Sequence, residues 1–185
     1  GKNYVVRKES ILNFPNCTFS AYWGSETLRS IFSTVPKLNP SYAETAQGQA
    51  SGDDFRFVRT RWELPLDRSR DWRVFAKGGD FFRYYCDWPL TINWSDGALV
   101  DYKKLTLRSV LISKRAEEFD GREALVWNRV NEKGFNVRAL PLGSKFADKA
   151  PAIFPIKSPY SLLGVLCSRL SDQLCAIQNP NRMFE

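Results

Sequence analysis

The middle of the chain is a succession of short strand-like runs, each separated from the next by turn-forming residues. The candidate strands are Phe55–Arg61, Trp72–Phe75, Leu90–Trp94, Leu125–Val130 and Phe135–Leu140. Turn residues occur between them at Asp96-Gly97, Asp120-Gly121 and Lys133-Gly134. Helical patterns lie at both ends of the chain instead of alternating with these strands. The sequence therefore predicts an α+β fold, with a small mixed or antiparallel sheet and flanking helices.

Capping residues and apolar spacing indicate a helix near each end of the chain. Ser25 is predicted to cap the first helix, and Pro36 to end it. For the second helix, Ser158 is the predicted cap and Pro159 the first helical residue. Its apolar stripe consists of Leu162, Leu163, Leu166, Leu170, Leu174 and Ile177. We expect this C-terminal helix to pack on the sheet.

Weaker patterns complete the predicted organisation. Thr18–Trp23 is expected to be extended, Asn39-Pro40-Ser41 to form a turn, and Leu105–Ala116 to form a helix. We expect one domain over residues 1–185, with an N-terminal sub-unit at residues 1–40.

The chain contains no histidine, and this absence narrows its chemistry. Serine–histidine and cysteine–histidine nucleophile systems, histidine-ligated metals and the usual general base are all excluded. The acidic residues are scattered, and the Asp53-Asp54 pair is more typical of a turn or a helix cap than of an acid–base site. Gly78-Gly79 lacks the spacing of a nucleotide-binding phosphate loop. We therefore predict a protein that binds rather than reacts, with no catalytic residue, metal ligand or bound cofactor of its own.

The cysteines and the hydropathy bear on location. The 4 cysteines include no C-x-x-C pair, and Cys167 and Cys175 fall in an apolar helical pattern that indicates buried, reduced thiols. No apolar run approaches the ~20 residues that a membrane-spanning helix needs. These features predict a cytoplasmic protein with no membrane partner.

The charge balance and the aromatic content favour a polyanionic partner. The chain has 27 Lys and Arg against 20 Asp and Glu, a formal net charge of +7, although a charge of this size also suits simple solubility. Cations and aromatic rings interleave in two segments, Phe55–Trp62 and Arg68–Tyr85. Cations can contact phosphates, and flat rings can stack on bases, while the alternative is that the rings are core and the cations solvated.

The candidate DNA-binding residues come from these segments and from two further positions. They are Arg56, Arg59, Arg61, Arg73, Lys77, Gly78, Gly79, Arg83, Asn93 and Lys145. Of these, Asn93 and Lys145 are candidates for reading base edges. The Lys77-Gly78-Gly79 stretch is singled out because glycines let a backbone approach a ligand closely and leave amides for phosphate.

Several stretches resemble one family in the order in which they occur. Residues 46–59 read A-Q-G-Q-A-S-G-D-D-x-x-F-V-R, similar to the G-x-x-T-G-D-N-x-x-F-x-R segment that opens the DNA-recognition region of large adenine-specific DNA methyltransferases. Residues 73–85 and 92–97 resemble their K-G-G-[ED]-F-R-x-[WY]-Y and V-N-W-x-x-D-G segments. Residues 119–128 are similar to F-R-x-G-I-T-W-S, and residues 160–180 to Y-x-L-G-x-L-C-S-K followed by L-N-P-T. The chain thus resembles the PglX-type methyltransferases of bacteriophage-exclusion (BREX) systems, with relatives in DISARM defence and type IIG/IIL restriction–modification enzymes.

This resemblance implies a role in an N6-adenine DNA methyltransferase of phage defence or restriction–modification. Such enzymes join an S-adenosylmethionine domain, which carries an Asn-Pro-Pro-Tyr motif, to a target recognition domain. Here Asn39-Pro40-Ser41-Tyr42 lacks the second proline, and no glycine-rich cofactor strand precedes it. The family's pattern also changes at Lys149-Ala150-Pro151-Ala152, and Lys103-Lys104 lies in a variable stretch, so the target site does not transfer. The resemblance therefore implies a recognition domain that cannot methylate alone, while the parent binds S-adenosylmethionine.

The expected partners are double-stranded DNA, the catalytic domain of the same polypeptide and other defence-system proteins. In the expected mechanism, Lys and Arg contacts to phosphates supply most of the affinity and a few side chains in a groove supply discrimination. Two alternatives remain open at this point: a protein-interaction scaffold of a defence complex, and a nucleic-acid binder without sequence preference.

Overall fold

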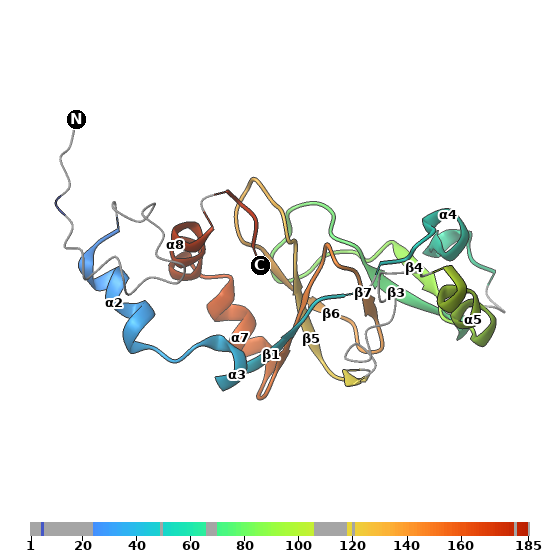
Figure 1. Ribbon diagram of the computed structural model, residues 1–185, viewed down its shortest axis with the longest axis horizontal. Coiled ribbons are helices and arrows are strands. Elements are labelled where there is room, and N and C mark those ends of the chain that lie inside the picture. The colour runs from blue at the N-terminus through green and yellow to red at the C-terminus, as the bar shows by residue number, and fades with distance from the viewer. Residues whose placement is uncertain are drawn as a thin grey trace.

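The computed structural model describes residues 5, 24–48, 50–65, 70–105, 118–119, 121–179 and 181–184. The molecule is elongated, with α2 (Glu26–Thr34) near one end and α4 (Asp54–Phe57) and α5 (Asp96–Leu105) at the other (Figure 1). Two β-sheets lie between these ends, and the predicted α+β fold class is confirmed. The remaining helical segments are α3 (Leu38–Ser41), the 3-10 turn η3 (Arg61–Glu63), α7 (Pro159–Leu166) and α8 (Arg169–Gln178). Within the described ranges, no helix has the length and apolar character needed to traverse a lipid bilayer.

The first sheet is antiparallel and buried on both faces. Its spatial order is β1 (Ala43–Ala46), β8 (Ala152–Pro155), β5 (Ala124–Trp127) and β6 (Val137–Leu140). Alternate residues of a strand point to opposite faces. Leu125 and Ile153 accordingly pack with Leu163 of α7 on one face, whereas Val126 and Phe154 belong to a separate core cluster on the other. Burial of both faces explains why β5 and β8 are apolar at nearly every position.

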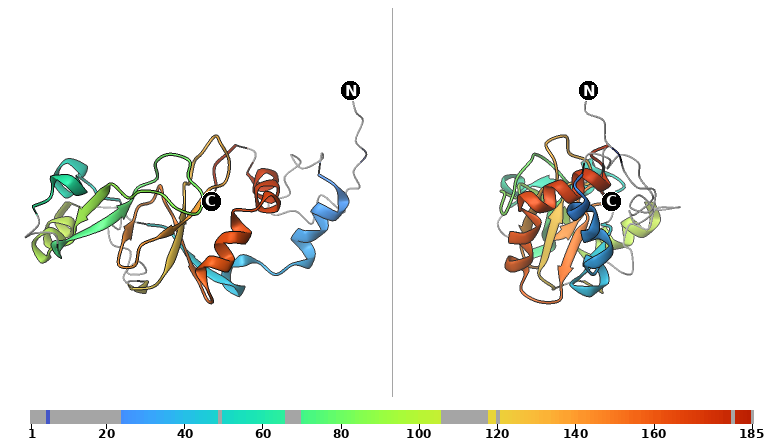
Figure 2. Two further views of the ribbon diagram at one scale, coloured as in Figure 1. Left: turned by 180° about the vertical axis from the view of Figure 1, so that it is seen from behind. Right: turned by 90° about the vertical axis from the view of Figure 1, so that its left-hand side faces the viewer.

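The second sheet is smaller and mixed. Its order is β2 (Val58–Thr60), β4 (Leu90–Asn93), β3 (Trp72–Ala76) and β7 (Lys145–Phe146). The first three strands are antiparallel, while β7 pairs parallel to β3 and places Lys145 opposite Phe75. Helix α5 packs near this sheet, where the rings of Phe57 and Tyr102 lie 4.2 Å apart between centroids. The two sheets thus follow one another along the long axis of the molecule (Figure 2).

The terminal helices confirm part of the predicted pattern. Ser25 caps α2, because its hydroxyl accepts a hydrogen bond of 3.2 Å from the amide of Leu28. The C-terminal helix packs on the first sheet as expected, but it is two helices and not one. The break falls at Ser168, whose hydroxyl accepts from the amide of Ser171 and caps α8. Cys167, just before this break, is a buried free thiol, and Cys175 is a half-buried one.

Two other expectations about local structure are wrong, and some strands were not predicted. Residues 55–61 were expected to form one strand, but Asp53 caps a helical turn, α4, so that only Val58–Thr60 is extended. Asp96-Gly97 begins α5 instead of forming a turn between strands. Strands β1, β7 and β8 are absent from the predicted set.

The turn expected at Asn39-Pro40-Ser41 falls within the short helical segment α3, in which Asn39 itself has non-helical backbone angles. Two further expectations fall wholly or mostly on residues that the structure does not describe. The extended segment expected at residues 18–23 lies outside the described residues, and so does nearly all of the helix expected at 105–116. The sub-unit at residues 1–40 stays a prediction.

Candidate nucleic-acid interface

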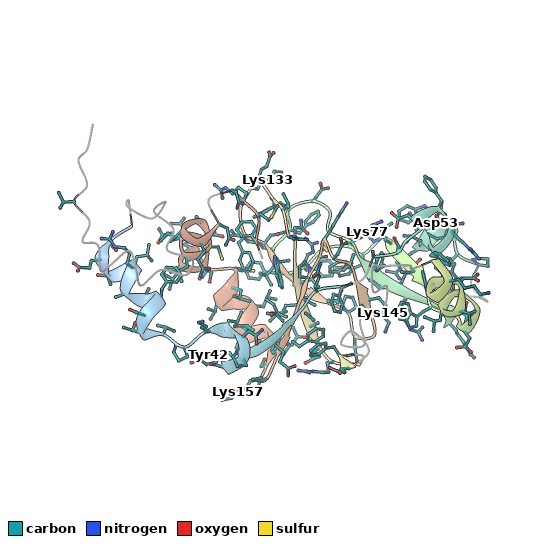
Figure 3. All side chains as sticks on the ribbon, in the orientation of Figure 1. Tyr42, Asp53, Lys77, Lys133, Lys145 and Lys157 are labelled. Atoms are coloured by element: carbon teal, nitrogen blue, oxygen red, sulfur yellow. The ribbon has the colours of Figure 1, made fainter. Side chains whose placement is uncertain are left out.

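The glycine loop, residues Lys77–Asp80, leaves the end of β3 and leads towards the first sheet. Gly78 and Gly79 have φ angles of 87° and 110°, in a region that side chains with a Cβ rarely adopt, which explains the need for glycine at both positions. Beyond the loop, Tyr84 forms a parallel bridge with Arg138 of β6. The glycine loop therefore spans the distance between the two sheets, on the side of the molecule where Lys77 is marked in Figure 3.

Carbonyl groups of the glycine loop are bound from inside the protein. The guanidinium of Arg138 donates to the carbonyl of Gly78 at 3.0 Å and to that of Asp80 at 3.3 Å. The side-chain amide of Asn128 donates to the carbonyl of Gly79 at 2.8 Å. Asn128 and Arg138 are themselves buried and joined by a hydrogen bond of 2.7 Å. The loop is thus held by side chains of the first sheet and of the residue that follows β5.

Lysines flank the glycine loop. The ammonium of Lys77 forms an ion pair with Asp54 of α4. A methyl group built on Gly78 would lie 3.6 Å from the carbonyl oxygen of Lys149, so the turn that carries the exposed Lys149 packs against the loop. Burial, and then the charge of Lys149, lower the pKa of Lys77 from its ordinary value, although the carboxylates of Asp54 and Asp148 lie close by. An additional anion beside Lys77 would favour the charged form of this lysine.

The basic residues of the first predicted segment have varied surroundings. Arg56 forms an ion pair with Asp101 of α5. Arg59 donates to the backbone carbonyls of Phe55 and Val58 at 2.5 and 2.7 Å. Arg61 is exposed at the start of η3. These residues are therefore not gathered at one point with the glycine loop, although Asp54 brings α4 up to Lys77.

A pocket on the second sheet brings Arg59 and Asn93 together. It has a volume of about 510 Å³ and is lined by Arg59, Glu63, Leu64, Pro65, Asp71, Trp72, Asn93 and Ser95. The side-chain oxygen of Asn93 accepts from the amide of Ser95 at 3.0 Å. Arg73, on β3, is exposed and donates to the carbonyl of Arg70 at 2.6 Å. The pocket thus combines a guanidinium, an amide and an indole ring, which are groups that can contact a base.

Arg83 and Lys145 are engaged within the protein. The guanidinium of Arg83 donates to both carboxylate oxygens of Asp172, at 2.5 and 2.6 Å, and to the carbonyl of Phe135 at 3.3 Å. Lys145 is 7% exposed, and its ammonium lies 4.4 Å from the ring centroid of Trp94. Asp172 and Phe135 lie far from Arg83 in the sequence, and Trp94 lies far from Lys145. The alternation of basic and aromatic residues along the chain therefore cannot predict these contacts.

The sequence interpretation missed the residues beneath and beside the glycine loop, namely Asn128, Arg138 and Lys149. A signal for one of them was present. Residues 135–140 were predicted to be a strand, and in a strand Arg138 shares a face with Leu140. Asn136 shares this face as well, and two polar residues beside an apolar one in a strand predicted to lie in a sheet indicate a buried polar contact.

Comparison with known proteins adds one relationship. No protein-family model matches the sequence. The chain is 24% identical over 203 residues to the adenine-specific methyltransferase PglX of Lacticaseibacillus casei (strain Zhang). The aligned region covers 99% of this chain but 17% of that protein, so the chain spans less than a fifth of the relative's length. The similarity supports a relationship to part of a PglX-type methyltransferase.

Among the described residues, no cluster of cysteine, aspartate and glutamate side chains is arranged to hold a metal ion.

Proposed function

We propose that this chain is the sequence-specific, double-stranded DNA recognition module of an N6-adenine DNA methyltransferase related to PglX. The observation that carries the proposal is the similarity along 99% of the chain to an adenine-specific methyltransferase. The sequence has no Asn-Pro-Pro-Tyr motif and a formal net charge of +7, so reading the DNA is the task that suits it best. S-adenosylmethionine would then be bound by a separate catalytic domain of the same polypeptide.

In the proposed mechanism, phosphate contacts and base contacts are made by different parts of the molecule. Lys77 and Lys149, beside the glycine loop, contact the sugar–phosphate backbone and supply salt-dependent affinity. Arg59 and Asn93 contact base edges from the pocket on the second sheet. Arg83 is left out of this interface because its guanidinium is directed to Asp172 of α8 and to Phe135 instead of to the glycine loop, and Lys145 because it is buried against Trp94.

The decisive experiment is an exchange of this segment between two related full-length methyltransferases of different specificity. The methylated sites of the hybrid are then mapped by sequencing. We expect the hybrid to methylate the site of the enzyme that donated the segment. An active hybrid that keeps its original site would disprove the recognition role.

The biological setting follows from the same proposal. A PglX-type enzyme would act in the cytoplasm, in phage defence of the BREX kind or in restriction–modification, together with other defence-system proteins. Loss of protection against phage in a strain whose Lys77 and Lys149 are both replaced by alanine would support this setting.

A protein-interaction module is the second candidate, and one surface favours it. The exposed side chains of Tyr85, Leu142 and Tyr160 line a shallow pocket of about 220 Å³. Binding to random and to cognate duplex DNA at low and high salt separates the candidates. A recognition module prefers the cognate duplex, a non-specific binder shows no preference, and an interaction module binds neither.

A further inference from the structure

Arg138 is a buried cation for which the structure provides no carboxylate partner. Its exposed fraction is 1%, and none of the ion pairs among the described residues includes it. Its guanidinium instead lies 5.3 Å from the ring centroid of Trp88 and donates to Asn128 and to backbone carbonyls of the glycine loop. Burying an unneutralised charge is costly, so its position beneath the loop calls for a function.

The bonds from Arg138 and Asn128 fix the direction of three successive peptide groups. The carbonyls of Gly78, Gly79 and Asp80 all accept hydrogen bonds from these two buried side chains. In a trans peptide the N–H of the next residue points away from the carbonyl. The amides of Gly79, Asp80 and Phe81 are therefore directed away from Arg138 and Asn128.

These amides have no acceptor within the described part of the chain. None of the hydrogen bonds there uses the N–H of Gly79, Asp80 or Phe81 as its donor. Successive outward amides form a concave site that favours an anion. Lys77 and Lys149 flank the loop and add positive potential, but the nearby carboxylates of Asp54, Asp80 and Asp148 outnumber these two cations. The amides, and not the local net charge, are therefore the groups that favour an anion at this loop.

We propose that the amides of Gly79, Asp80 and Phe81 bind the oxygens of one phosphodiester group, and that Arg138 is the residue that positions them. Naming the group as a phosphate of the DNA backbone rests on the proposed function. Arg138 acts through the loop and does not touch the anion. Its planar guanidinium is needed because it reaches the carbonyls of Gly78 and Asp80 at once, which a lysine ammonium on a flexible stem does less well.

The test is a titration of the ¹⁵N-labelled chain, followed by NMR, with a short DNA duplex and separately with dimethyl phosphate. We expect saturable downfield shifts of the amide protons of Gly79, Asp80 and Phe81 with both probes. Arg138→Met and Arg138→Lys should weaken duplex binding by about tenfold or more and abolish these shifts. Arg122→Met, which removes an arginine that lies over the rings of Phe119 and Phe154, is the matched control and should leave them in place.

The two probes separate failure of this inference from failure of the proposed function. If the duplex binds while the three amides do not move, the phosphate site is wrong and DNA recognition stands. If the duplex does not bind but dimethyl phosphate moves the amides, the anion site stands and DNA recognition falls. If neither probe moves them and the duplex does not bind, both are wrong.

An additional variant keeps the test independent of whether Arg138 variants fold. Asp80→Asn leaves the backbone unchanged and removes a carboxylate next to the proposed phosphate. We expect this variant to bind the duplex more tightly, and unchanged or weaker binding would overturn the placement of the phosphate at the glycine loop.

Discussion

Lys77 forms an ion pair with Asp54, and this contact joins two stretches that are separate in the sequence. Asp54 also accepts a hydrogen bond from the hydroxyl of Ser51, so the turn before α4 and the glycine loop form one connected unit. Both stretches resemble segments of the same methyltransferase family. If Lys77 contacts a DNA phosphate, the carboxylate of Asp54 competes with that phosphate for the Lys77 ammonium.

Replacing Asp54 by asparagine should therefore tighten DNA binding. The ion pair is partly exposed, with 24% of the Lys77 side chain and 48% of the Asp54 side chain accessible. Its loss should therefore make the free energy of DNA binding more favourable by at most ~1 kcal/mol. Fluorescence anisotropy with a labelled duplex measures the change. Glu26→Gln, at the far end of the molecule, removes the same charge and controls for net charge (Figure 1). Equal gains in both variants would contradict a local effect.

Lys77→Ala should lower affinity for all duplexes and reduce the salt dependence of binding. If Lys77 contacts one phosphate, the slope of log affinity against log salt concentration should fall by about one unit. Arg83→Ala is the matched comparison, because the sequence singled out both cations and both pair with an aspartate, but Arg83 pairs with Asp172 of α8 and does not flank the glycine loop. An unaltered slope for Lys77→Ala would remove Lys77 from the phosphate contacts.

The pKa of Lys77 predicts a dependence of binding on pH. The protonated ammonium is the form that binds phosphate, and burial together with Lys149 lowers its pKa from the ordinary value of 10.5. As pH rises through this lowered pKa, Lys77 loses its charge, so affinity should begin to fall at a lower pH than for an ordinary lysine. Lys77→Arg keeps its charge and should lack this part of the decline. Binding curves from about pH 7 to 10 test this, and identical declines in both proteins would refute it.

The ion pair between Arg83 and Asp172 should contribute to stability and not to DNA binding. Arg83→Met removes a partly buried ion pair, in which one guanidinium nitrogen contacts both oxygens of Asp172, and leaves that carboxylate unpaired, at a cost of about 1–3 kcal/mol. Urea unfolding of Arg83→Met, Asp172→Asn and the double variant measures the coupling between the two residues. Additive losses would show that the pair contributes no coupling energy.

Gly48 should not tolerate alanine. A methyl group at this position would overlap the backbone carbonyl oxygens of Phe146 and Ala147, so Gly48→Ala should destabilise the protein by about 1–3 kcal/mol. Gly164 in α7 is the control, because the space around its Cβ position is open within 4 Å. Gly164→Ala should stabilise the helix by about 0.5–1 kcal/mol. Thermal unfolding of both variants measures the contrast, and a stable Gly48→Ala protein would show that the backbone at residues 146 and 147 can move away from position 48.

The sequence predicted those helices and strands that are determined by neighbouring residues, such as helix caps and short apolar runs. Ser25 caps α2, Pro159 begins α7, and β3 and β4 lie close to the runs expected for them. The C-terminal segment was predicted to be one helix, but it forms two helices that are separated at Ser168. A serine between apolar positions can either continue a helix or cap a new one, and the sequence pattern does not distinguish these cases.

The candidate site was less predictable because its contacts are non-local. Lys77, Gly78 and Gly79 were identified from their own chemistry, and their role in binding stays a prediction. Arg138 lies on β6 and Asn128 directly follows β5, both in the first sheet. Only the folding of the chain brings these two side chains against the glycine loop. The sequence also gives no sign that Arg83 would be engaged by Asp172, on a helix far along the chain.

The parallel pairing of β3 with β7 has a consequence for synthesis on the ribosome. Strands β2, β4 and β3 emerge before β7, so one edge of β3 has no partner until residues 145 and 146 leave the exit tunnel. An unpaired strand edge is a template for misassembly with other chains. Truncated forms that stop short of Lys145 should therefore aggregate, whereas nascent chains that extend past Phe146 can protect this edge themselves.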